Sequence, residues 1–155
     1  MARLELKVVI ASQIIEVLND NAVLCSYSVS TSKFGTGSQE GSLKTPLGTF
    51  EVCEKHGENH PLNTVFKARK PRGEWSPEGS NYEGEDLILT RILRLRGLDK
   101  HNENTFQRFI YIHGTNEEDL IGSPASHGCI RMRRNDVAAL FEIIPIGTRT
   151  RISTR

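Results

Sequence analysis

Residues Tyr111–Met132 read YIHGTNEEDLIGSPASHGCIRM, and the interpretation of the chain depends on this stretch. It holds His113 and His127, each followed by a glycine, together with Cys129. A thiol becomes a strong nucleophile as the thiolate, and a nearby imidazole is the usual means of forming it. The stretch therefore predicts a Cys/His nucleophilic site.

The residues before and after the loop in this stretch are expected to be extended. Phe106 to Ile112 is patterned as a strand that ends at His113, where a sheet can hold a base while it faces a cleft. If the tripeptide from His127 to Cys129 is also extended, its two polar side chains point to the same side. Gly128 lets a peptide backbone approach closely, and the N–H groups around it are candidates for an oxyanion hole.

Spacing alone does not decide which histidine is the base. His127 is only two residues from the thiol of Cys129, which limits its freedom to reach it. His113 comes from another predicted strand and can meet the thiol squarely. The group that fixes the imidazole tautomer need not be acidic, and the backbone carbonyl of Gly114 is a candidate.

Two other interpretations use the same residues. Cys129 can be a buried structural cysteine flanked by capping histidines. A zinc site can also be built from His113, His127 and Cys129, with His56 or His60 as the fourth ligand. The spacing His127-x-Cys129 is unusual for zinc ligands, which weakens this second interpretation.

The composition predicts one globular domain over residues 1–155. The charged fraction is 25%, and the net charge of +1 gives no reason to expect nucleic acid or an acidic membrane surface as a partner. Glu5 and Lys7 interrupt the apolar residues near the N-terminus, so no secretory signal is recognised. The expected location is the cytoplasm, or the periplasm if a signal has been removed. Nothing in the sequence predicts the oligomeric state.

The hydrophobic pattern predicts a mainly β fold, a sandwich or barrel-like sheet with one short helix near 135–144. Apolar residues alternate with polar ones near the N-terminus, and Asn135 is a plausible N-cap of the helix. A long irregular loop is expected at 56–84, because this segment is rich in glycine and proline. The loop, which carries Trp75, is a candidate lid, partner surface or solvated insertion. Cys25 and Cys53 are expected to be buried or half-buried strand residues.

Several motifs together resemble the catalytic domain of the L,D-transpeptidase family of bacterial peptidoglycan enzymes. The resemblance covers nearly the whole chain and leaves the 56–84 loop unaccounted for. The motifs that carry it are Lys44-Thr45-Pro46-Leu47-Gly48-Thr49-Phe50, Ile112-His113-Gly114-Thr115, Ser126-His127-Gly128-Cys129-Ile130-Arg131-Met132, Asn135-Asp136-Val137 and Pro145-Ile146-Gly147-Thr148.

The resemblance implies roles for individual residues. Cys129 corresponds to the acylated nucleophile, and His113 to the base, with the carbonyl of Gly114 as its partner. The oxyanion and substrate side corresponds to Ser126, His127, Gly128 and Arg131. Arginine suits bidentate binding of the carboxylates of a stem peptide, so Arg131 is expected at the border of the substrate pocket. No metal and no other cofactor is expected.

The resemblance also implies a substrate. Family members attack the bond between the L-centre of the third residue of a peptidoglycan tetrapeptide stem and the terminal D-alanine. Water as the acceptor gives L,D-carboxypeptidase activity, and an amine gives a 3→3 cross-link. Because no export signal is recognised, we expect hydrolysis of soluble muropeptides during recycling. The alternatives are a cross-linking L,D-transpeptidase, a metal-dependent hydrolase and a non-catalytic muropeptide-binding module.

Overall fold

The computed structural model describes residues 3–79, 82 and 84–155. Ten strands and one α-helix are present within this part of the chain. They are β1 (Leu4–Val9), β2 (Ile14–Asn19), β3 (Ala22–Ser30), β4 (Gly48–His56), β5 (Thr64–Lys67), β6 (Lys70–Glu74), β7 (Ile88–Gly97), β8 (Tyr111–Gly114), β9 (Ile130–Met132), α1 (Arg134–Ile143) and β10 (Arg149–Ser153). Single 3₁₀ turns lie at Lys100–Asn102 and Glu118–Leu120. Among the described residues, no helix is both long and apolar enough to cross a membrane.

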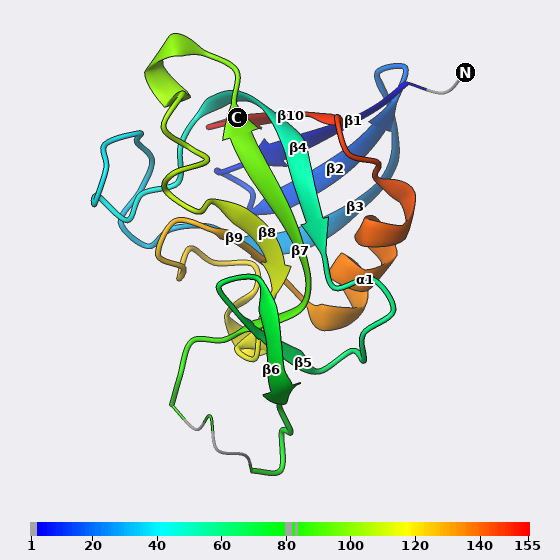
Figure 1. Cartoon of the computed structure of the whole chain (residues 1–155). Helices are drawn as coiled ribbons and strands as arrows, with labels where there is room; N and C mark the ends of the chain where they lie inside the picture. The colour runs from blue at the N-terminus through cyan, green and yellow to red at the C-terminus, as the bar shows by residue number, and fades with distance from the viewer. Residues whose placement is uncertain (1–2, 80–81, 83) are drawn as a thin grey trace.

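Eight of the strands close into a barrel. Their order is β4-β10-β1-β2-β3-β9-β8-β7, and β7 pairs back with β4 to complete the ring. The β1–β10 and β8–β9 pairs are parallel, and the other pairs are antiparallel. Figure 1 shows α1 against one side of this barrel and the β5–β6 hairpin projecting below it. The predicted mainly β fold with one short helix is confirmed.

Alternating side chains build the core. Leu6 and Val8 of β1 are buried inside the barrel, while the charged residues Glu5 and Lys7 beside them stay outside its core. This is the two-residue period that the sequence predicts. Helix α1 adds Val137, Leu140 and Phe141 to the same hydrophobic cluster. Each fully buried aliphatic side chain stabilises the fold by about 1.5–3 kcal/mol.

The start of α1 differs from the prediction. Asn135 is not the N-cap, because the helix begins at Arg134 and Arg133 occupies the cap position without a side-chain hydrogen bond. The carboxylate of Glu118 accepts the Arg134 backbone N–H at 2.7 Å instead. A carboxylate is favourable there because the first N–H groups of a helix carry partial positive charge. The cap therefore comes from another part of the chain.

The sequence predicts an irregular loop at 56–84, and this prediction is only partly correct. It contains the β5–β6 hairpin, and β5 also pairs with the first residues of β7. Trp75 packs against a small cluster of Val65, Leu87 and Leu89, so this part of the segment has a core of its own. The described part of the segment is therefore a folded arm on the edge of the barrel, and positions 80, 81 and 83 lie outside the described residues.

The strand predicted over Phe106 to Ile112 is shorter than expected. Strand β8 begins at Tyr111, and the residues before it form turns. The ring of Phe106 lies 3.4 Å below the Arg94 guanidinium, whose Nη2 donates to the Phe106 carbonyl at 2.8 Å. A cation over an aromatic face is attractive. This contact holds the turn against β7 in place of a strand.

Candidate active site

The candidate site lies where β8 and β9 run side by side. The two strands are parallel, with His113 directly opposite Arg131. Cys129 immediately precedes β9, so the nucleophile candidate and the base candidate come from neighbouring strands. A cavity of about 130 Å³ opens at this point. It is lined by Asp86, Ile88, His113, Ser126, His127, Cys129 and Arg131.

His113 is buried and held by one backbone contact. Its Nδ1–H donates to the carbonyl of Gly114 at 2.7 Å. That bond puts the proton of the neutral ring on Nδ1, so Nε2 keeps its lone pair and can accept a proton. Burial lowers the pKa of His113 to about 4, and the ring is therefore neutral at neutral pH. His113 has the protonation state that a general base requires.

The contact with Gly114 depends on the absence of a side chain. A Cβ at this position would lie 2.7 Å from the carbonyl oxygen of Leu89 and 2.8 Å from Oγ1 of Thr90. Strand β7 approaches that closely at the point where its pairing register with β8 shifts, between Leu89 and Ile92. Glycine is thus required by packing against β7, and the carbonyl that holds His113 stays in place.

Cys129 carries a neutral thiol in the free protein. Its Sγ accepts the Tyr111 N–H at 3.3 Å and donates to the Phe109 carbonyl at 3.3 Å. Burial raises the pKa of the thiol to about 11. A thiol with this pKa does not ionise by itself at neutral pH, so attack on a carbonyl requires a base to take the proton.

The turn that carries the thiol is fixed by buried hydroxyl groups. Ser126 Oγ donates to the Cys129 carbonyl at 2.6 Å and accepts the Gly128 N–H at 3.2 Å. Oγ1 of Thr45 donates to the Gly128 carbonyl at 3.0 Å. Gly128 has φ +123°, a value that L side chains rarely adopt, so the tripeptide is a bend and the expectation of an extended segment is wrong.

The bend changes the candidates for the oxyanion hole. Because the Gly128 N–H already donates to Ser126, it is engaged in the free protein. The Cys129 N–H is the other donor that the sequence singled out. Ser126 itself supports the turn, and its hydroxyl points at the backbone on both sides of the bend.

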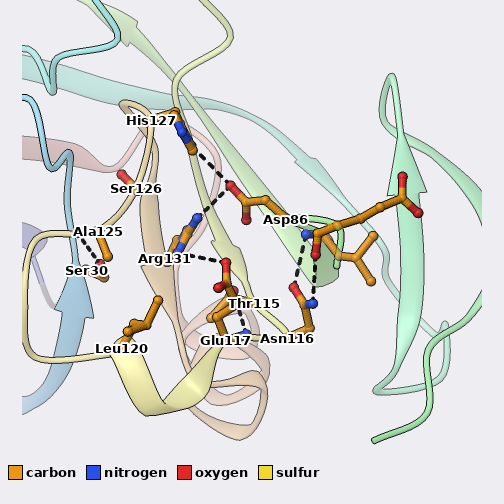
Figure 2. A network of polar contacts seen from close by, with 12 residues as sticks. Ser30, Asp86, Thr115, Asn116, Glu117, Leu120, Ala125, Ser126, His127 and Arg131 are labelled. Atoms are coloured by element: carbon orange, nitrogen blue, oxygen red, sulfur yellow. Dashed lines mark hydrogen bonds and ion pairs between the residues drawn. The ribbon is translucent and has the colours of Figure 1, made fainter. Parts of the chain in front are cut away.

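Arg131 is almost completely buried, with 2% of its side chain exposed. Its Nη2 lies 2.6 Å from Oδ2 of Asp86, and its Nη1 lies 3.5 Å from Oε1 of Glu117. Figure 2 shows the guanidinium between these two carboxylates. The sequence placed Arg131 at the pocket, and it does line the cavity. Its charge, however, already faces two acidic groups.

His127 stands at the exposed rim of the same cavity. Its Nδ1 lies 3.3 Å from Oδ2 of Asp86, and its ring is tilted against that of Phe34 at 5.9 Å between centroids. Both contacts turn His127 toward the rim, and the thiol of Cys129 is bonded to backbone groups instead. The two histidines of the motif therefore occupy different environments.

The two histidines considered as the fourth zinc ligand, His56 and His60, lie outside the cavity. His56 contacts Glu54 at 3.0 Å, and His60 packs edge-on against Phe66. Within residues 3–79, 82 and 84–155, no three His, Cys, Asp or Glu side chains are grouped as a metal site. Neither His56 nor His60 is among the residues that line the cavity with Cys129.

Some residues of the site were not singled out from the sequence as parts of it. Asp86, Asn116 and Glu117 all belong to the polar network in Figure 2. Asp86 is far from the motifs along the chain, and nothing in its neighbours marks it. The only signal for Thr45 was its motif, because a threonine before proline is ordinary turn chemistry.

Comparison with protein families matches residues 4–152 to the L,D-transpeptidase catalytic domain. The chain belongs to this family. Its L,D-transpeptidase relative YqjB of Bacillus subtilis is 32% identical over 137 residues, which are 88% of this chain and 64% of YqjB. YbiS of Escherichia coli K12 is 52% identical over 42 residues, 27% of this chain and 14% of YbiS.

Solved L,D-transpeptidases share the fold. The enzyme from Mycobacterium smegmatis superposes with a TM-score of 0.64 at 18% identity, covering 98% of this chain and 59% of that one. An Enterococcus faecium L,D-transpeptidase gives 0.60 at 14% identity, covering 97% and 50%. The chain thus spans 64% or less of the length of these relatives.

Proposed function

We propose that this L,D-transpeptidase family member is a cysteine acyl-enzyme that acts on peptidoglycan tetrapeptide stems. Cys129 is the nucleophile, and His113 is the base. One observation carries the proposal. Within the cavity that His113 and Cys129 both line, the bond from Nδ1–H of His113 to the Gly114 carbonyl leaves Nε2 free to take the thiol proton.

Acylation begins with proton transfer. His113 Nε2 takes the proton of Cys129 as Sγ attacks the carbonyl carbon of the third stem residue. The backbone N–H of Cys129 stabilises the negative oxygen of the tetrahedral intermediate. The C–N bond to D-alanine then breaks, and the leaving amine takes the proton from His113. A thioester to Cys129 and free D-alanine result.

Water is the proposed acceptor for the second half of the reaction. His113 removes a proton from water, the hydroxide attacks the thioester, and the tripeptide leaves as Cys129 regains its proton. Water can reach the thioester from the rim of the cavity, where the side chains of His127 and Asp86 are 47% and 38% exposed.

The proposed enzyme is therefore an L,D-carboxypeptidase that trims soluble muropeptides. A cytoplasmic location and a role in muropeptide recycling belong to the same proposal. Cell fractionation with an antibody against the chain tests the location. Recovery with the cell envelope would contradict it.

Mass spectrometry of the reaction products tests the function. The protein is incubated with a free tetrapeptide, alone and with an excess of an amine acceptor stem. Tripeptide and D-alanine are the expected products in both samples, and a dominant cross-linked dimer would reject the hydrolytic choice. Cys129→Ala is the control, and activity that disappears with a chelator but persists in this variant would indicate a metal-dependent hydrolase.

A cross-linking transpeptidase is the second candidate. It is favoured by the solved relatives, which are L,D-transpeptidases; one of them, LdtMt1, was solved in complex with imipenem. Imipenem therefore offers a second probe of Cys129. A covalent adduct of imipenem on Cys129 is expected whether the enzyme is a carboxypeptidase or a transpeptidase. The absence of an adduct with both imipenem and tetrapeptide would favour a non-catalytic binding module.

A further inference from the structure

Asp86 forms an acidic part of the cavity wall. It lies between the 56–84 segment and β7, and it lines the cavity together with His113 and Cys129. Its carboxylate is 38% exposed, so a bound molecule can reach it. Asp86 has no part in the proton transfers described above, and this leaves its position in the site unexplained.

The chain positions this carboxylate through its backbone. Asn116 accepts the Leu87 N–H at 3.0 Å with Oδ1 and donates Nδ2–H to the Glu85 carbonyl at 2.9 Å. One side-chain amide therefore grips the backbone on both sides of Asp86. Figure 2 shows the result, with the Asp86 carboxylate turned toward Arg131 and His127.

Only one oxygen of Asp86 is used. The contacts with Arg131 and His127 both go to Oδ2, and no other described residue forms a hydrogen bond with Oδ1. The guanidinium is also incompletely satisfied. Nη1 of Arg131 is buried and has no hydrogen-bond partner among the described residues, since Glu117 is 3.5 Å away. This N–H is buried and needs an acceptor, so the group on this wall that a hydrogen-bond donor can reach is Oδ1 of Asp86.

The charges of Asp86 and Arg131, which line the cavity, balance, but Glu117 beside Arg131 makes the three-residue network negative overall. Asp86 and Glu117 each contribute one negative charge, and the single positive charge of Arg131 lies between them. A substrate carboxylate here would face two carboxylates, whereas an ammonium group would restore neutrality. Asp86 offers such a group a free oxygen inside the cavity that contains the thiol.

We propose that Asp86 recognises an ammonium group on the side chain of the third residue of the stem, and therefore favours a stem with a basic residue at that position. The inference rests on the proposed function, in which the carbonyl of that residue acylates Cys129. Its side chain starts one carbon from the carbonyl under attack, so it must lie close to the cavity wall. Asp86 Oδ1 accepts from the ammonium, and Glu117 supplies a second negative charge nearby. Arg131 lies between the two carboxylates and forms an ion pair with each.

Binding measurements test the proposal without requiring turnover. Cys129→Ala protein is titrated by calorimetry with L-Ala-γ-D-Glu-L-Lys-D-Ala and with the same peptide carrying Nε-acetyl-lysine. We expect the free ammonium to bind about tenfold more tightly, as for a hydrogen bond between charged groups. Asp86→Asn in the same background should lose most of that preference and bind the acetylated peptide as before.

The controls separate recognition from structural support. Glu85→Gln removes a neighbouring negative charge that is exposed and does not line the cavity, and it should keep the full preference. Glu117→Gln should reduce the preference by a smaller factor than Asp86→Asn, and it serves as the second variant if Asp86→Asn does not fold. Equal affinity of the two peptides would overturn the proposal, as would an equal loss of both affinities in Asp86→Asn.

The fate of the proposed function is read separately. Wild-type protein that binds the ammonium peptide preferentially but releases no D-alanine would refute the acyl-enzyme reaction and keep the role of Asp86. Release of D-alanine at equal kcat/KM from both peptides would support the acyl-enzyme reaction and refute the role of Asp86.

Discussion

His113 and His127 have the same side chain, lie at the same cavity and are built into different parts of the molecule. His113 is in the barrel wall, 4% exposed, with its Nδ1–H held by a backbone carbonyl. His127 is on the rim, 47% exposed, with its Nδ1 at a carboxylate. Burial holds the pKa of His113 near 4, which keeps its Nε2 available.

The difference teaches that the surroundings of a histidine, rather than its place in a motif, distinguish the proposed base His113 from His127. A backbone carbonyl fixes the tautomer of His113 without adding a charge, so the ring stays neutral where it must accept a proton. His127 instead contacts the carboxylate of Asp86 through its Nδ1. If this contrast holds, exchanging the two histidines for alanine must give unequal results.

The largest expected effect is on the chemical step. We expect His113→Ala to slow acylation by about 10³-fold, because positioned bases contribute about 10²–10⁴-fold. His127→Ala should leave a slow residual rate well above that of His113→Ala. Single-turnover formation of the thioester on tetrapeptide, followed by mass spectrometry, measures both variants. Equal losses would break the comparison.

The reactivity of the Cys129 thiol toward a small reagent tests whether His113 and Cys129 are both neutral in the free protein. Because burial raises the pKa of Cys129 to about 11, the thiolate fraction should rise about tenfold for each pH unit between 7 and 10. The rate of Cys129 alkylation by iodoacetamide should rise with it. Digestion and mass spectrometry separate Cys129 from Cys25 and Cys53. A rate already at its plateau at pH 7 would indicate a preformed thiolate–imidazolium pair instead.

A smaller effect is expected from the turn that positions the thiol. Ser126→Ala leaves the Gly128 N–H and the Cys129 carbonyl without their partner, which should destabilise the fold by about 1–3 kcal/mol. Chemical denaturation measures the loss. Ser123→Ala is the matched control, because its hydroxyl is exposed and contacts only the Leu120 carbonyl. A similar change in both variants would show that the buried hydroxyl adds nothing.

Much of this could be predicted from the sequence, because it is local or carried by motifs. Alternating apolar residues predict the strands, since the period of a strand is fixed by its geometry. The motif around His113 predicts its carbonyl partner, because Gly114 is the next residue. The Cys129 turn is only partly predictable. Its φ of +123° at Gly128 depends on hydroxyl groups, including that of Thr45, which is 83 residues away along the chain.

The remaining features depend on contacts between distant segments. The β5–β6 hairpin escaped prediction because Ala68 and Arg69 adopt positive φ values in its turn, where Asn-Gly is the usual signal. The helix start was misplaced because its cap is Glu118. Asp86 has no local signature, since Asn116 and Arg131 give it its position in the site.

The closed ring of strands has a consequence for how the molecule tolerates change. Because β4 and β7 pair directly, the chain leaves the barrel after His56 and returns at Ile88, on the two adjacent strands that seal the ring. The described part of the segment between these points lies outside the ring, and its returning end carries Asp86. Its length and sequence can therefore change without removing a strand of the ring. If Asp86 has the proposed role, such a change would alter substrate preference while His113 and Cys129 keep their positions.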